Sequence, residues 1–287
     1  MGILNLTPDS FSDGGRIRGV EAAVQAAGRM LAQGADLLDL GGQSTRPGAQ
    51  DVGAEEETRR VLPALRAIKA ACPQAIVSVD TFRAAVAASA LENGADWIND
   101  VRGANVTHGA PGGSLRDPAM LPLIARAGCP YVLMHSRGDS GSMDELALYR
   151  DVVAEVIAEL EAASAEALKA GVRREQILWD PGLGFAKTSE QNLELLRRLP
   201  ELADCGYPLL LGPSRKRFIG TVLAEPRARA RLWGTAAVCA LGVDRGAAVL
   251  RVHDVAPIAQ TVRMAAALTA PGAQALLTPS MRSSISW

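Results

Sequence analysis

The sequence predicts a closed (βα)8 TIM barrel of the α/β class, with its active site at the C-terminal mouth of the strands. Three observations predict this fold. The chain has 287 residues, and barrels of this kind need about 250. Short apolar runs alternate with polar loops and helix-like segments. The unusual polar and glycine-rich stretches follow the apolar runs, whereas the links that precede the runs are plain, as expected when the functional loops lie at one end of a barrel.

The strands are predicted from eight apolar runs. These runs are continuously apolar rather than alternating, which is typical of parallel strands that are covered on both faces. An open doubly wound sheet has the same alternation of elements and is the alternative fold. In chain order the runs are GILNL (2–6), ADLLDL (35–40), AIVSV (75–79), WIN (97–99), YVLM (131–134), ILWD (177–180), PLLL (208–211) and AVLRV (248–252).

Two of the helical segments have a distinct pattern. Residues 54–71 open with three glutamates, which favour a helix N-terminus, and Pro63 is expected to kink or split this helix. Residues 151–171 are expected to end with Gly171 as a C-terminal cap. Their apolar face is predicted to hold Val153, Val156, Ile157, Leu160 and Leu168.

The composition is that of an ordinary globular protein. A net charge of −1 and a 48% hydrophobic content give no reason to expect a nucleic-acid or membrane-surface partner, and no apolar run has the length of a membrane span. The four cysteines are far apart in the sequence, so we expect no zinc or redox pair and a reducing compartment. We expect a single domain over residues 1–268 and a flexible tail over residues 269–287, where periodicity is lost.

Three polar residues each end an apolar run: Asp80, Asn99 and Asp180. Any one of them could simply cap the following helix or turn. Together, at one barrel mouth, they offer several hydrogen-bond acceptors in a poorly solvated pit, where an unpaired polar group costs roughly 1–3 kcal/mol. This predicts a planar ligand rich in N–H donors, such as the edge of an amino-pyrimidinone.

A second group of residues is cationic and follows the seventh and eighth strands. Arg215 and Lys216 follow one run, and Arg251 and His253 follow the next, where phosphate sites of such barrels commonly form. Arg251 interrupts an apolar run, and a buried arginine needs a partner. Asn5 offers a neutral oxygen, which suits Mg²⁺ held mainly by substrate phosphates.

Several motifs in fixed order are spread over most of the chain and support a ligand site at the barrel mouth. They are MGILNLTPDSFSDGG, DLGGQSTRPGA, SVDT, IND, LMH, DPGLGFAKT, GPSRK and RVHDV. Together they resemble the dihydropteroate synthase family, over about residues 1–268, with variants nearest to those of fungal and plant members. The resemblance implies an Mg²⁺-dependent transferase of folate biosynthesis. It would condense 4-aminobenzoate with dihydropterin methyl diphosphate through a cation-like transition state, and it would be a sulfonamide target.

The resemblance also implies roles for individual residues. Pterin binding is implied for Asp80, Asn99, Val101, Met134, Asp180, Phe185, Gly212, Lys216 and Arg251. Binding of 4-aminobenzoate is implied for Phe11, Thr45, Arg46, Pro47, Phe185 and Ser214. Diphosphate binding is implied for Asn5, Thr45, Arg251 and His253, with Asn5 as the metal ligand. Catalytic roles are implied for Asp13, Arg46, Lys216, Arg251 and His253.

Partners and rival functions follow from the same resemblance. It implies a homodimer, fusion to other folate-pathway domains in some full-length members, and a cytoplasmic location, or a mitochondrial one in a fungus or plant. One rival is a methyltetrahydrofolate–corrinoid methyltransferase, which would share the three strand-end acceptors but would not need the cationic residues around a diphosphate. The other rival is a non-catalytic pterin-binding scaffold.

Overall fold

The strands form one closed barrel. The computed structural model describes residues 1–6, 19–45, 48–106 and 115–269. Its eight strands pair in parallel in the order of the sequence. The barrel closes because Ile3 N donates to Val252 O and Val252 N donates to Met1 O, each at 2.9 Å. The predicted (βα)8 barrel is therefore confirmed, and the open sheet is wrong.

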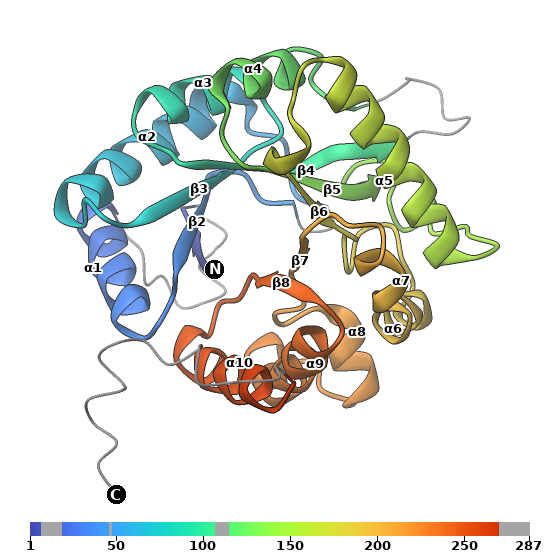
Figure 1. Ribbon diagram of the computed structural model, residues 1–287. Helices are drawn as coiled ribbons and strands as arrows, with labels where there is room; N and C mark the ends of the chain where they lie inside the picture. The colour runs from blue at the N-terminus through green and yellow to red at the C-terminus, as the bar shows by residue number, and fades with distance from the viewer. Residues whose placement is uncertain (7–18, 46–47, 107–114, 270–287) are drawn as a thin grey trace, which may run out of the picture.

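The helices surround the strands as an outer ring (Figure 1). The strands are β1 (Gly2–Asn5), β2 (Leu37–Gly41), β3 (Ile76–Asp80), β4 (Trp97–Val106), β5 (Tyr131–Arg137), β6 (Ile177–Asp180), β7 (Leu209–Leu211) and β8 (Ala247–Leu250). The α-helices are α1 (Gly19–Ala32), α2 (Gly53–Ala71), α3 (Ala84–Glu92), α4 (Met120–Ala127), α5 (Val152–Lys169), α6 (Ser189–Arg197), α7 (Leu199–Ala203), α8 (Arg217–Val222), α9 (Leu232–Asp244) and α10 (Val255–Thr269). Short 3-10 turns lie at η2 (Arg174–Gln176) and η3 (Ala228–Arg231).

The largest difference from the predicted strands is the length of β4, which continues well beyond WIN. Its register against β5 shifts between Asp100 and Ala104. The extension includes the buried polar residues Asp100 and Asn105, which have partners on β5: Tyr131 donates to Asp100 at 2.7 Å, and Asn105 donates to Ser136 at 2.9 Å. Because these bonds come from the neighbouring strand, hydrophobicity alone did not reveal the extension.

The helix α2 runs without a break through Pro63, so the predicted split is wrong. Proline removes the hydrogen bond to the carbonyl of Arg59. Both residues lie on the exposed side of the helix, where water can take the place of the missing donor.

The helix α5 ends as predicted, with Gly171 at a φ of 95°. Gly171 N donates to Leu168 O and Val172 N donates to Ala167 O, which is a Schellman ending. The predicted apolar face is wrong at Leu168, which is 42% exposed. The small residues Ala163 and Ala167 are buried instead, because they bring the helix close to the strands.

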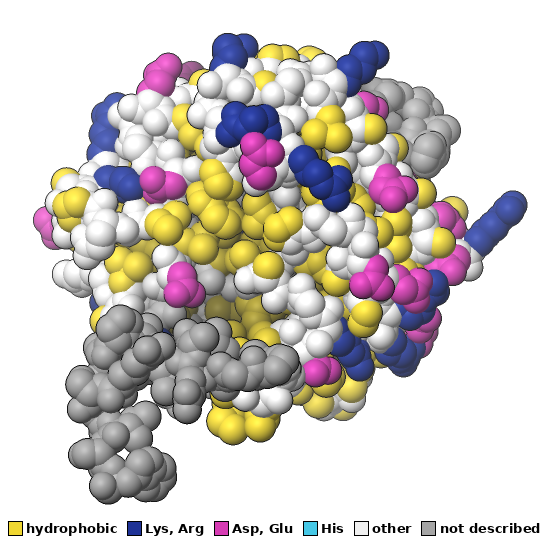
Figure 2. All heavy atoms as spheres, in the orientation of Figure 1, with side chains coloured by type: hydrophobic (Ala, Val, Ile, Leu, Met, Phe, Trp, Pro, Cys, Tyr) yellow, Lys and Arg dark blue, Asp and Glu magenta, His cyan; other side chains and the backbone are white. Residues whose placement is uncertain are grey.

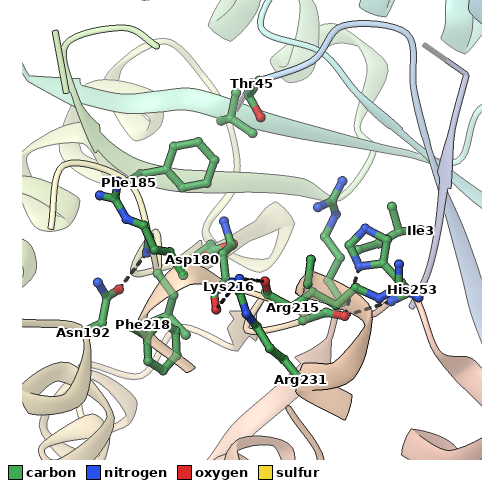
Figure 3. Close-up of a pocket in the computed structure, with 18 of the residues that line it drawn as sticks. Ile3, Thr45, Asp180, Phe185, Asn192, Arg215, Lys216, Phe218, Arg231 and His253 are labelled. Carbon is green, nitrogen blue, oxygen red and sulfur yellow. Dashed lines mark hydrogen bonds between the residues drawn. The ribbon is translucent and has the colours of Figure 1, made fainter. Parts of the chain in front are cut away.

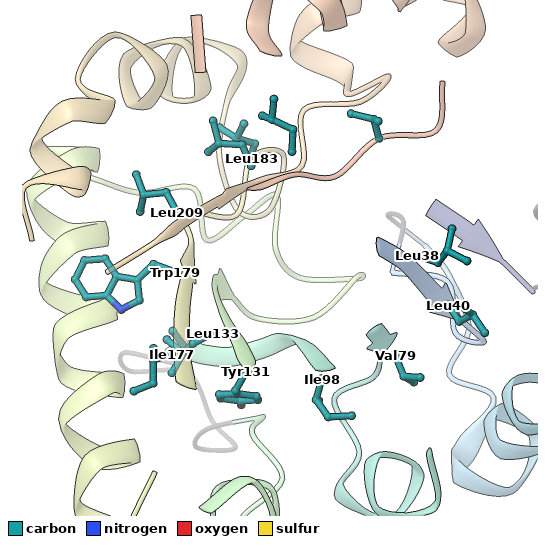
Figure 4. Close-up of a cluster of buried hydrophobic side chains, with 14 of the residues drawn as sticks. Leu38, Leu40, Val79, Ile98, Tyr131, Leu133, Ile177, Trp179, Leu183 and Leu209 are labelled. Atoms are coloured by element: carbon teal, nitrogen blue, oxygen red, sulfur yellow. The ribbon is translucent and has the colours of Figure 1, made fainter. Parts of the chain in front are cut away.

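Strand residues that face the helices form the main core (Figure 4). Leu38, Leu40, Val79, Ile98, Leu133 and Trp179 are among its fully buried members. On the face drawn in Figure 2, hydrophobic side chains gather near the centre and charged side chains lie mostly toward the rim. In the described part of the chain, no helix combines the length and the apolarity that a membrane span needs.

Alternate residues of the same strands face the barrel interior. Met1, Leu37, Val132, Leu178 and Leu210 form a separate buried cluster there. Two residues further along each strand, the next inward position, stand Asp39, Met134, Asp180 and Gly212. The barrel thus has an apolar lower layer, and the layer above it, at the C-terminal mouth, carries the carboxylates of Asp39 and Asp180 beside Met134 and Gly212. Of the predicted tail, residues 270–287 lie outside the described residues.

Candidate active site

A pocket of about 810 Å³ opens at the C-terminal mouth of the barrel (Figure 3). Every predicted site residue that the structure describes lines it: Asn5, Thr45, Asp80, Asn99, Val101, Met134, Asp180, Phe185, Gly212, Ser214, Lys216, Arg251 and His253. The other four, Phe11, Asp13, Arg46 and Pro47, lie outside the described residues. Residues from all eight strands or the loops after them therefore meet in one cavity.

Arg251 is held between two carboxylates at the centre of the pocket. Its Nε donates to Asp39 Oδ2 and its Nη2 donates to Asp80 Oδ2, both at 2.6 Å. Asp39 is fully buried and is absent from the predicted site. The sequence pattern that could have revealed Asp39 is the same as that of Arg251, a charged residue inside an apolar run. Each of the two residues is the buried charge partner that the other requires.

The strand-end carboxyls have perturbed acidity. Burial raises the pKa of Asp80 to about 7, against the opposing attraction of Arg251. Burial also raises the pKa of Asp180 to about 6, although its Oδ1 accepts a hydrogen bond from Gly182 N at 2.7 Å. A ligand that donates N–H groups to these carboxyls would stabilise their charged forms.

Five buried side-chain oxygens have no hydrogen-bond partner among the described residues, and two of them, Asp39 Oδ1 and Asn99 Oδ1, belong to residues beside Arg251 or in the pocket wall. Asn99 Nδ2 donates to Asp39 Oδ2 at 3.3 Å, so this amide presents its oxygen elsewhere. Because an unsatisfied buried acceptor is costly, these atoms indicate a need for donors from a bound molecule or from water.

An apolar slot lies beside the acceptors. Phe82, Val101 and Met134 form a buried cluster against which Phe185 packs. Lys216 Nζ lies 4.2 Å from the centre of the Phe185 ring, within the range of a cation–π contact. Phe82 is a further residue absent from the predicted set. A flat ring could occupy this slot with its edge toward the acceptors.

The cationic side of the pocket is formed by the ends of β7 and β8. His253 N donates to Ser214 Oγ at 3.2 Å, and His253 Nδ1 lies 3.0 Å from the same oxygen. The Ser214 hydroxyl therefore contacts both the backbone and the imidazole of His253 and holds this side chain at the end of β8. Arg215, by contrast, is paired with Asp254, whose Oδ1 lies 2.7 Å from Nη2.

Arg231 holds the segment that carries these cations. Its guanidinium donates to the backbone carbonyls of Glu225, Pro226, Arg215 and Lys216, at 2.7 to 3.4 Å. A Cβ added at Gly220 would overlap Arg231 Nε, so the glycine makes room for this clamp. This side chain fixes the backbone on either side of Lys216.

The arrangement suits one kind of ligand. A planar heterocycle can lie in the slot and donate to the strand-end acceptors, while an anionic group attached to it can reach Arg251 and His253. A Cβ at Gly212 would meet nothing within 4 Å, so the space beside it stays open. Fold and site together define a barrel enzyme that acts on an anionic, N–H-rich heterocycle.

Comparison with known proteins places the chain in a family. The family model described as pterin binding enzyme matches residues 1–253. The chain is 46% identical over 268 residues to the dihydropteroate synthase of Synechocystis sp., covering 93% of this chain and 89% of that protein. It belongs to the pterin binding enzymes and, among them, to the dihydropteroate synthases, which are transferases of folate biosynthesis.

Two further relatives differ in chain length or were solved with a ligand. The folic acid synthesis protein fol1 of Pneumocystis carinii is 41% identical over 273 residues, but the match covers 93% of this chain and only 35% of that longer protein. A solved dihydropteroate synthase of Xanthomonas albilineans with 4-aminobenzoic acid has a TM-score of 0.84 and 43% identity. It matches 94% of this chain and 93% of its own.

Proposed function

We propose that this pocket condenses 4-aminobenzoate with (7,8-dihydropterin-6-yl)methyl diphosphate to give 7,8-dihydropteroate and pyrophosphate. One observation carries the proposal. The strand-end acceptors Asp80, Asn99 and Asp180 share a single pocket with Lys216, Arg251 and His253, in a chain that belongs to the dihydropteroate synthases.

The pterin ring would lie between Met134, Val101 and Phe185. Its N–H groups would donate to Asp180 and Asn99, and Lys216 would donate to a ring acceptor. Arg251 would stack on the ring from its position between Asp39 and Asp80. Hydrogen bonds to charged groups contribute about 1.5–3 kcal/mol each, so these contacts are enough to orient the ring.

The chemical step would be a substitution at the pterin methylene carbon. The C–O bond to diphosphate breaks and its electron pair leaves with pyrophosphate. The aryl amine nitrogen forms the new C–N bond and loses a proton. The dihydropterin ring spreads the positive charge that develops, so no residue is needed as a nucleophile. Arg251 and His253 would stabilise the charge that gathers on the leaving diphosphate.

The residues around Asn5 fit a magnesium ion. A Cβ at Gly41 would lie 3.7 Å from Asn5 Oδ1 and 3.9 Å from Asp80 Oδ2, so both oxygens lie beside this glycine. Among the described residues, no group of three or more His, Cys, Asp or Glu side chains could hold a metal. Asn5 would therefore supply one oxygen ligand, with the diphosphate and water supplying the others. The ion would neutralise charge on the leaving group.

The second substrate would enter beside Phe185. Thr45 and Ser214 line this part of the pocket, and the residues 11, 13, 46 and 47 would complete it. A sulfonamide, which carries an aryl amine of similar shape, would compete with 4-aminobenzoate there.

We also propose a homodimer of a single barrel domain over residues 1–268, located in the cytoplasm or, in a plant or fungus, in mitochondria. The helices α9 and α10 expose large apolar side chains, Trp233 at 75%, Leu241 at 49%, Met264 at 59% and Leu268 at 74%. Burial against a second copy would remove this surface from water. The longer relatives, such as the fol1 protein of which the match covers 35%, support fusion to further folate-pathway domains in the full-length protein.

A turnover assay tests the function. Purified protein is mixed with both substrates and Mg²⁺, and pyrophosphate release and dihydropteroate formation are followed together. We expect equal amounts of both products. Methyl transfer from methyltetrahydrofolate would indicate the corrinoid-type rival, and pterin binding without pyrophosphate release would indicate a scaffold.

A further inference from the structure

A buried lysine, Lys187, lies in the part of the pocket wall formed by residues 181–187. Lys187 is only 4% exposed, and its Nζ has three acceptors. It lies 2.9 Å from His135 Nδ1, 3.0 Å from Phe185 O and 3.3 Å from Gly182 O. One ammonium group therefore joins both ends of the loop after β6 to the strand β5.

The neighbours of His135 decide the protonation of this contact. His135 Nε2 lies 2.7 Å from Glu159 Oε2, and Glu159 is also paired with Arg137. Burial lowers the pKa of His135 to about 4. Hydrogen bonds from His135 and Arg137 outweigh burial and lower the pKa of Glu159 to about 2. A neutral imidazole beside a carboxylate keeps its proton on Nε2, so Nδ1 is an acceptor for Lys187.

All three partners of Lys187 are then acceptors, and only the ammonium form can donate to all of them. Burial lowers the pKa of Lys187 to about 7, against the attraction of Asp180. Keeping Lys187 charged in this buried position costs free energy. Its hydrogen bonds to His135, Gly182 and Phe185 offset that cost.

The loop itself has little freedom to pack in another way. Gly182 has a φ of +67°, and a Cβ there would overlap the carbonyl oxygen of His135. Gly182 N donates to Asp180, while Gly184 N donates to Asn192 Oδ1 of α6 at 2.6 Å. Lys187 is the contact that ties this chain of bonds to β5.

We propose that Lys187, oriented by His135, is a positioning residue that holds Phe185 and Asp180 in the geometry the two substrates require. It does this through its ammonium group, whose hydrogen bonds to Gly182 O and Phe185 O fix the backbone of the loop. The proposal rests on the proposed function for its kinetic consequence, and on the structure alone for its effect on the loop.

The experiment compares Lys187→Met with Lys69→Met. Lys69 makes the same kind of contacts away from the pocket, donating to Ala75 O and Asp96, so its variant is the matched control. Amide hydrogen exchange of residues 182–185 is measured in the ligand-free proteins. We expect exchange to be about tenfold faster in Lys187→Met, from the loss of a charged hydrogen bond, and unchanged in Lys69→Met.

Steady-state kinetics give the second readout. We expect Lys187→Met to raise KM for both substrates about tenfold with a smaller fall in kcat, because binding geometry is lost while the groups that stabilise the leaving diphosphate remain. If Lys187→Met gives no cooperative thermal transition, Lys187→Gln, which keeps amide donors, is measured in the same way. Unchanged exchange at residues 182–185 in a folded variant overturns the proposal. If exchange is faster in the variant but the native protein shows no turnover, the loop argument stands and the proposed function is refuted.

Discussion

The guanidinium of Arg251 is anchored from inside the barrel by Asp39, with 2.6 Å between Nε and Oδ2. These two residues are 212 positions apart in the chain. The contact leaves one face of the guanidinium toward the pocket while its charge stays paired. A buried cation that is already paired and oriented needs little reorganisation when an anion binds.

Replacing Asp39 with Asn tests this anchor. We expect pyrophosphate, with Mg²⁺ present, to bind about tenfold more weakly, because Arg251 keeps only Asp80 as a charged partner and loses its orientation. Breaking a buried pair can also reduce the free energy of unfolding by about 3–5 kcal/mol. Calorimetric titration gives the affinity and urea unfolding gives the stability. Asp96→Asn, at a half-exposed pair with Lys69, is the control. Unaltered affinity in Asp39→Asn would show that the anchor is not needed.

The Ser214 hydroxyl contacts both the backbone N–H and Nδ1 of His253 and can be removed alone. In Ser214→Ala the backbone N–H and Nδ1 of His253 both lose their partner. We expect kcat to fall about three- to tenfold, the equivalent of one ordinary hydrogen bond of about 1 kcal/mol, and KM for 4-aminobenzoate to rise, because Ser214 also lines the part of the pocket proposed for the second substrate. Thr261→Val serves as the control, since the Thr261 hydroxyl donates to Pro257 O within α10. A rise in KM for 4-aminobenzoate with constant kcat would mean that Ser214 acts on the second substrate alone.

The Arg231 clamp can be broken from either side. Arg231→Met removes the donors, and Gly220→Ala forces the guanidinium away because its new Cβ would overlap Nε. We expect both variants to raise KM for the pterin substrate by about tenfold through displacement of Lys216, since each loses several bonds to backbone carbonyls. Arg197→Met removes an exposed arginine of α6 that pairs with Glu190 and Glu194 and should behave as the native protein. Different effects of the two clamp variants would argue against a shared cause.

The sequence predicts the barrel and much of the pocket for one physical reason. Parallel strands covered on both faces must be apolar, so the polar residues that end them stand out, as Asp80 and Asp180 do. Asp39 stands out in the same way and was nevertheless absent from the predicted site. Its meaning depends on Arg251, which only the closed barrel brings beside it.

Other contacts leave no pattern in the sequence. His135 and Lys187 meet although 52 residues separate them, and neither disturbs a hydrophobic period. Arg231 lies in an arginine-rich stretch whose composition is typical of a solvated surface, yet its guanidinium donates hydrogen bonds to backbone carbonyls. Such contacts depend on how loops pack over the barrel mouth. The charge pattern alone could not distinguish Arg231 from Arg217, which is largely exposed and paired with Asp144.

Asp180 is predicted to contribute to binding at the expense of stability. Asp180→Asn replaces an acceptor by a donor that would face the pterin N–H groups. We expect the pterin substrate to bind roughly ten- to a hundredfold more weakly, since a charged hydrogen bond contributes about 1.5–3 kcal/mol. Native binding should also weaken as pH falls below about 6, where Asp180 becomes protonated. Calorimetric titrations at pH 5 and pH 8 would show both effects, and a variant with native affinity would remove Asp180 from the pterin site.

The same substitution should stabilise the ligand-free protein, and the sign follows from the pKa. Burial raises the pKa of Asp180 to about 6 in the folded state, whereas an unfolded chain has about 3.9. As pH rises from about 4 to 6, the unfolded state loses its proton first, so the native carboxyl progressively destabilises the fold. Each pKa unit is equivalent to about 1.4 kcal/mol. Asp180→Asn avoids this cost, and its amide oxygen can still accept from Gly182 N. Its advantage in free energy of unfolding over the native protein should therefore grow between pH 4 and pH 6, to about 3 kcal/mol at most, and then stay constant.

Asp151, which caps α5 and whose pKa is lowered mainly by the hydrogen bond from Ala154 N, is the contrasting case, and Asp151→Asn should show no such gain. Urea unfolding at pH 4, 6 and 8 measures the three proteins. An advantage of Asp180→Asn that is the same at every pH would mean that the buried charge of Asp180 is not the cause.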